Sequence, residues 1–166
     1  IQRMRKFDDR YISEYVSAIV LAHAVCESVI NAIIAIGLTH VGTPELFELL
    51  ERADIKQKWF IGPKSFVPSY TFPKGTAMGE TLVYLCKQRN ALVHHKVNMR
   101  VKGEDVIKGS GFTRSSYEAD LRWMKRFFNL PYDLNELALT QLPGLPVMIL
   151  GAREPISHDF PVVISQ

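Results

Sequence analysis

An arginine, an asparagine and a histidine stand within six consecutive residues of this chain, at Arg89, Asn90 and His94. An arginine can bind two phosphate oxygens at once through its guanidinium fork. A histidine, whose ordinary pKa is about 6.5, can accept or release a proton near neutral pH. These groups could therefore cleave a phosphodiester with no metal ion and no other cofactor.

The bare spacing is weak evidence, because ten arginines and five histidines in 166 residues place a His five positions after an Arg about 0.3 times by chance. Charge placement strengthens it. Positions 87–108 carry a net charge of +4, whereas the whole chain carries +3. Such a surplus is either a solvated face or a surface that binds a polyanion, here RNA or a nucleotide. The candidates for substrate contact are Lys87, His95, Lys96 and Arg100.

Helical geometry limits what one copy of the motif can do. Asn90 and His94 are four residues apart and share a face, whereas Arg89 and His94 are five apart and diverge by about 140°. Two copies of the helix packed about a two-fold axis could bring both pairs to one cleft, so we expect a homodimer through this helix. There Arg89 would hold the phosphate, Asn90 would orient the histidine or donate to a phosphate oxygen, and His94 would carry the proton.

The natural reaction for these groups is attack by an RNA 2′-hydroxyl on the neighbouring phosphate. The substrate supplies the nucleophile, so only acid–base catalysis and charge stabilisation are required. The products would carry a 2′,3′-cyclic phosphate and a 5′-hydroxyl. DNA, which lacks the 2′-hydroxyl, should resist cleavage.

One long helix is predicted over 8–38, ended by Gly37. Its middle is apolar enough for a membrane span, but His23, Glu27 and Asn31 recur every four residues as a polar stripe, which favours a core helix. Cys26 and Cys86 are expected to be buried, reduced thiols. No secretory leader is recognised before residue 8, so we expect a cytoplasmic protein with no membrane segment.

Capping residues and prolines indicate the remaining elements. Thr43 and Pro44 open a helix to about residue 52, and Asp54 opens a short one through Trp59. A loop over 61–75 leads to a helix capped by Thr76, which carries the motif, and a last helix follows Ser115, with Pro131 interrupting or kinking it. The sequence predicts an all-α, up-and-down bundle of about four to five helices over 1–141, followed by a proline-rich extended arm over 142–166.

This pattern resembles the HEPN domain family. Arg89, Asn90 and His94 match the family's Arg-x4-6-His signature with its polar second residue, and Glu27 on the first long helix matches more weakly. The resemblance covers about residues 8–139 and implies a helical bundle that dimerises through its active-site helices and often acts as a metal-independent ribonuclease in toxin–antitoxin, phage-defence or RNA-processing systems. An antitoxin or regulatory protein would then be a further partner. The 61–75 loop and the arm are not family features, so partner and substrate are not inherited.

Several alternatives stay open. Some HEPN members are non-catalytic modules that bind nucleotides, RNA or proteins. Arg89 could form a structural ion pair with Glu27, His94 could be an interior or helix-end histidine, and Glu27 could orient either residue or be purely structural. Aromatic and basic types are also mixed at Trp59, Trp123, Lys125 and Arg126, but helical spacing favours core rings with solvated bases over base stacking.

Overall fold

All regular structure in the described part of the chain is helical. The computed structural model describes the backbone of residues 2–94 and 117–145 and the side chains of 13–93 and 119–145. The α-helices are α1 (Gln2–His40), α2 (Phe47–Glu51), α3 (Ile55–Ile61), α4 (Ala77–His94) and α6 (Tyr117–Gln141), with 3-10 turns η1 (Pro44–Leu46) and η2 (Gly62–Ser65). The predicted all-α helical bundle is thereby confirmed.

Helix α1 forms the spine of the core. Its inward positions recur at helical spacing and are fully buried: Ile19, Cys26, Ile30, Ile33, Ile34 and Leu38. By length and composition alone, the stretch Ser13–His40 could cross a membrane, and 44% of its most apolar window is buried inside the protein. One such helix is weak evidence for a span, because the core helix of a soluble bundle has the same length and composition.

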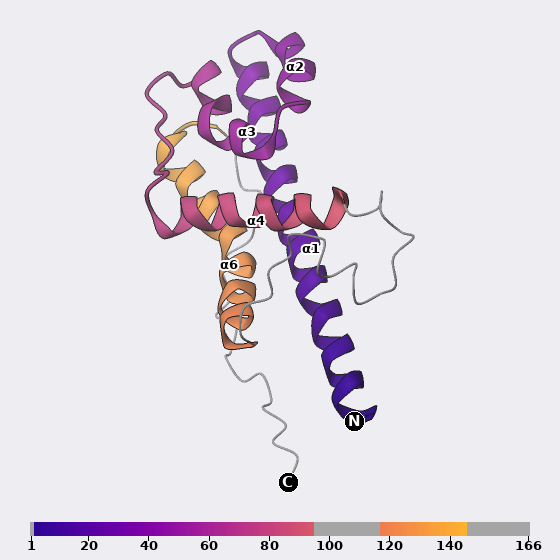
Figure 1. Ribbon diagram of the computed structural model, residues 1–166. Helices are drawn as coiled ribbons and strands as arrows, with labels where there is room; N and C mark the ends of the chain where they lie inside the picture. The colour runs from indigo at the N-terminus through magenta and orange to yellow at the C-terminus, as the bar shows by residue number, and fades with distance from the viewer. Residues whose placement is uncertain (1, 95–116, 146–166) are drawn as a thin grey trace.

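The three long helices are not strictly up-and-down. Figure 1 shows α1 and α6 running in the same direction, with α4 crossing them. Tyr15 near the beginning of α1 contacts Phe127 in the first half of α6, with ring centroids 6.3 Å apart. At the other end, the Gln141 amide donates to the Thr71 carbonyl and accepts from the Thr71 N–H, both at 2.8 Å. The connection between α3 and α4 is thus fastened to the end of α6.

Two helix boundaries differ from the prediction because tertiary packing overrides the local signal. Gly37 does not end α1 but lies inside it, where a Cβ atom would come within 2.5 Å of the Phe66 ring. Pro131 lies within α6, which continues to Gln141, flanked by the fully buried Leu130 and Leu134. Burial on both sides of the proline compensates for the backbone hydrogen bond that it removes.

Other local predictions are confirmed. The Asp54 carboxylate caps α3 by accepting from the Lys56 N–H at 2.9 Å. Thr76 precedes α4, and its hydroxyl accepts from the Gly79 N–H at 3.4 Å. Thr43, in contrast, makes no side-chain cap, and its segment forms η1 and the five-residue α2. Cys26 and Cys86 are buried free thiols. Ser115 and the arm beyond residue 145 lie outside the described residues.

Candidate functional site

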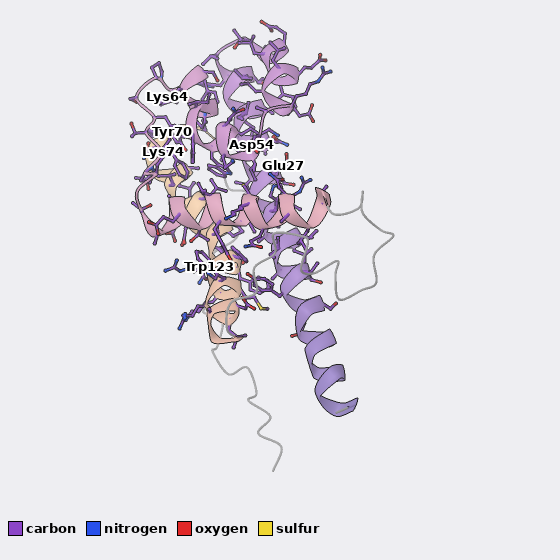
Figure 2. All side chains as sticks on the ribbon, in the orientation of Figure 1. Glu27, Asp54, Lys64, Tyr70, Lys74 and Trp123 are labelled. Atoms are coloured by element: carbon purple, nitrogen blue, oxygen red, sulfur yellow. The ribbon has the colours of Figure 1, made fainter. Side chains whose placement is uncertain are left out.

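Charged and titratable side chains from α1, α3 and α4 meet on one side of the bundle. We call His23, Glu27, Asp54, Lys58 and Arg89 the junction cluster. The Lys58 Nζ lies 3.1 Å from Glu27 Oε1, and His23 Nδ1 lies 3.9 Å from Glu27 Oε2. Figure 2 shows Glu27 and Asp54 near each other where α1 and α3 meet beside α4. Glu27 is therefore the central acceptor of the cluster.

His23 reports the electrostatics of this cluster. Burial lowers the pKa of His23 below its ordinary value of 6.5, and the positive charge of Arg89 lowers it further. Glu27 and Asp54 oppose that shift, while Lys58 adds to it. The imidazole is only 8% exposed. His23 is thus disposed to be neutral at pH 7, when it can accept or donate a hydrogen bond without carrying charge.

Arg89 has no carboxylate within ion-pairing distance among the described side chains. It is half-buried near the C-terminal end of α4, and its Nη1 donates to Asn90 Oδ1 at 3.3 Å. Its charge also affects the pKa of Cys86, which burial raises to about 12. A half-buried guanidinium that lacks a contacting anion is suited to bind one.

The structure gives Glu27 a different partner from the one considered in the sequence. Its carboxylate pairs with Lys58, whose side chain is only 1% exposed, instead of with Arg89. Lys58 was missed because a lysine in a short helix is ordinarily a solvated charge. Its place directly before the apolar run Trp59-Phe60-Ile61 was the available signal. Asp54, predicted as a cap, lies close enough to act on His23 as well.

The other predicted site residues are placed as follows. Lys87 is exposed on α4. His94 is the last residue of α4, but its side chain is not among those described. His95, Lys96 and Arg100 lie outside the described residues altogether. The structure thus brings Arg89, Asn90 and Glu27 to one region, and it leaves the predicted convergence of Arg89 with His94 as a prediction.

Asn31 continues the polar stripe of α1 one turn beyond Glu27. Its Oδ1 is buried with no hydrogen-bond partner in the part of the chain that the structure describes. Gln88 on α4, next to Arg89, has an Oε1 that is likewise buried with no hydrogen-bond partner among the described residues. A buried acceptor without a donor costs free energy, so each atom needs a donor from elsewhere.

The described side chains offer no group of three His, Cys, Asp or Glu that could hold a metal ion. Among the described residues, one surface hollow lies against Ala35, Ile36, Thr39 and His40, and another lies between the first part of α1 and Met124 and Phe128 of α6. Neither is lined by a residue of the junction cluster. Within the cluster, the half-buried Arg89, which has no contacting carboxylate among the described side chains, is the member suited to bind an anion.

Comparisons with protein-family models, with curated proteins and with solved structures found no match to this chain.

Proposed function

We propose that the chain is a HEPN-like, metal-independent endoribonuclease in which Arg89, Asn90 and His94 act on RNA. The observation that carries the proposal is the state of Arg89, which is half-buried, hydrogen-bonded to Asn90 and without a contacting carboxylate among the described residues. An arginine with a purely structural role would be expected to pair with Glu27, whose carboxylate instead pairs with Lys58.

The proposed reaction needs only base, acid and charge stabilisation. The RNA 2′-oxygen forms a bond to phosphorus as its proton passes to a histidine, and the bond from phosphorus to the 5′-oxygen breaks as that oxygen gains a proton. His94 of one copy carries that proton from the 2′-oxygen to the 5′-oxygen, opposite Arg89 of the other copy. Arg89 binds the phosphate oxygens, where negative charge develops, and Asn90 fixes the guanidinium through its Oδ1.

Glu27 acts in this proposal as a positioning residue. Its carboxylate holds the Lys58 ammonium and lies 3.9 Å from His23 Nδ1, so it offsets positive charge next to Arg89. Without Glu27, the junction cluster would hold Lys58 and Arg89 against the single carboxylate of Asp54. Lys87 and, beyond the described residues, His95, Lys96 and Arg100 are the proposed RNA contacts.

The proposed setting is a cytoplasmic homodimer that cleaves RNA in a toxin–antitoxin, phage-defence or RNA-processing system. An antitoxin or regulatory protein that covers the Arg89 region is part of that proposal. The proposed setting and partner rest on the same residues as the proposed activity.

Four single variants test the assignment in one RNA-cleavage assay with excess chelator. Arg89→Ala and His94→Ala should each reduce the cleavage rate by about 10²-fold or more. The matched controls Arg52→Ala and His40→Ala remove exposed side chains of the same types outside the cluster and should leave the rate unchanged. Thermal unfolding of each variant separates loss of activity from loss of fold.

Two outcomes would reject the nuclease assignment. The first is cleavage that persists in both Arg89→Ala and His94→Ala, which would assign it to a contaminant. The second is intact RNA at every protein concentration. If RNA is bound but stays intact, and Arg89→Ala weakens the binding, the chain is instead a non-catalytic HEPN-like binding module.

A further inference from the structure

A second group of cations lies outside the junction cluster, on the first half of α6. Arg122, Lys125 and Arg126 are all exposed. Lys125 and Arg126 follow Arg122 by three and four residues, so both lie next to Arg122 on the helix surface. None of them makes an ion pair with a side chain that the structure describes. Like charges at this spacing destabilise a helix slightly, so the group is not explained by the stability of α6.

Arg126 is held in place by aromatic rings. Its guanidinium carbon lies 4.9 Å from the centroid of the Trp123 ring, within the range of a cation–π interaction. The Trp123 ring in turn stacks on Tyr84 of α4, with centroids 4.0 Å apart and ring planes at 28°. Figure 2 places Trp123 on α6 next to where α4 crosses. Arg126 is thereby positioned at low entropic cost where two helices meet.

In this geometry the Trp123 ring is already contacted by Tyr84 and by Arg126. A ring stacked at 4.0 Å covers one face of the indole, so the guanidinium of Arg126 must lie over the other. Base stacking requires a free aromatic face. A ligand at this surface is therefore contacted through its charge, by the basic side chains.

Helix α4 adds one exposed cation next to this group. Lys87 is exposed, three residues after Tyr84 and two before Arg89. Glu80, also exposed and four residues before Tyr84, is the opposing charge on this part of α4. Together with Arg122, Lys125 and Arg126, these side chains sum to +3.

We propose that Arg122, Lys125, Arg126 and Lys87, here called the α6 basic surface, bind the phosphate backbone of RNA without reading its bases and hold the strand beside α4, the helix that bears Arg89. The inference rests on the proposed function for the choice of RNA as ligand. Phosphate contacts carry no sequence information, so strands of different sequence are held alike.

The test is fluorescence anisotropy of a short labelled single-stranded RNA, titrated with His94→Ala protein so that the strand stays intact. The triple change Arg122→Ala, Lys125→Ala, Arg126→Ala in that background should weaken binding at least tenfold at low salt. Each phosphate contact contributes about 0.7 to the slope of log affinity against log salt for single strands, so the slope should lose about two of its magnitude. Single-stranded DNA of the same sequence should bind equally well.

A matched triple change, Arg52→Ala, Lys64→Ala, Lys74→Ala, removes the same charge from exposed positions outside the α6 basic surface and should alter binding less than twofold. Equal weakening by both triple variants would overturn the inference, as would an unchanged salt slope or a strong dependence on base sequence. The inference would also be overturned if anionic lipid vesicles bound the protein only when the α6 cations are present, while RNA bound equally well with and without those cations.

The two proposals fail separately. Wild-type protein that binds RNA through the α6 basic surface but never cleaves it would refute the nuclease and leave this inference standing. Wild-type protein that cleaves RNA while the α6 triple variant binds as the parent does would refute this inference alone.

Discussion

The nearly buried ammonium of Lys58 lies 3.1 Å from a carboxylate of Glu27 that is itself 38% exposed. Removing one partner of this ion pair therefore has a different effect from removing the other. Without Lys58, the Glu27 carboxylate could still be hydrated, whereas without Glu27 the Lys58 ammonium would be left in a nearly dry site.

Glu27→Ala should consequently destabilise the protein more than Lys58→Met. Leaving a buried charge unpaired costs about 3 kcal/mol, and partial access of water to the pair places the expected loss at the low end. Lys58→Met keeps the aliphatic packing and should cost about 1 kcal/mol. Urea unfolding of both variants measures the difference, and the reverse order would contradict the asymmetry.

The change Gly37→Ala should be an exception to the rule that alanine stabilises a helix interior. Alanine normally stabilises a helix interior by about 1 kcal/mol relative to glycine. Here the new methyl group would meet the Phe66 ring at 2.5 Å, so Gly37→Ala should lower the stability by about 1–3 kcal/mol. Gly75→Ala, with no atom within 4 Å of the added Cβ, is the matched control and should change the melting temperature little. A rise in melting temperature for Gly37→Ala would contradict the packing described here.

His23 should make the folded protein less stable at acidic pH. Burial and Arg89 lower the folded-state pKa of His23 below 6.5, so the unfolded chain takes up a proton that the folded chain resists. The free energy of unfolding should therefore fall as the pH drops below about 6.5 and level off once the folded-state pKa is passed. Unfolding between pH 8 and 5 should show this fall in the wild type and less of it in His23→Gln. The exposed His40→Gln should behave like the wild type, and identical profiles for all three would refute the role of His23.

Much of the fold follows from local signals in the sequence, and the exceptions have specific causes. The helical spacing of Tyr15, Val16 and Ile19 predicts α1, and Asp54 predicts the start of α3. Gly37 and Pro131 mislead because the contact with Phe66 and the burial of Leu130 and Leu134 come from distant segments. In the same way, residue types alone nominate Glu27 and Arg89, but only tertiary structure assigns Glu27 to Lys58. A side chain's partner across 31 positions is not encoded in local spacing.

The two cysteines should be unreactive in the folded protein. Burial raises the pKa of the Cys86 thiol to about 12 and that of Cys26 further, so neither forms the reactive thiolate at pH 8. In the time that a thiol reagent at pH 8 takes to modify an exposed free thiol, it should modify neither cysteine of the folded protein. In denaturant it should modify both cysteines within that time. Fast labelling of the native protein would show that the core between α1 and α4 opens readily.

The dimer can be tested by mixing variants. If each reaction uses groups from two copies, Arg89→Ala and His94→Ala proteins, each inactive alone, should regain part of the activity when mixed at equal amounts. Mixed dimers retain one Arg89 and one His94 in the shared cleft. A mixture no more active than its components, together with a monomeric mass in solution, would reject the two-fold site.

In the proposed reaction the substrate's own 2′-hydroxyl is the nucleophile, and no metal takes part. The most direct measurement compares an RNA strand with the same strand carrying a 2′-O-methyl group at the cleaved position, in excess chelator, with the product ends identified by mass spectrometry. We predict cleavage of the unmodified strand to a 2′,3′-cyclic phosphate and a 5′-hydroxyl, and no cleavage at the methylated position. Cleavage at the methylated position, or 5′-phosphate products, would contradict it.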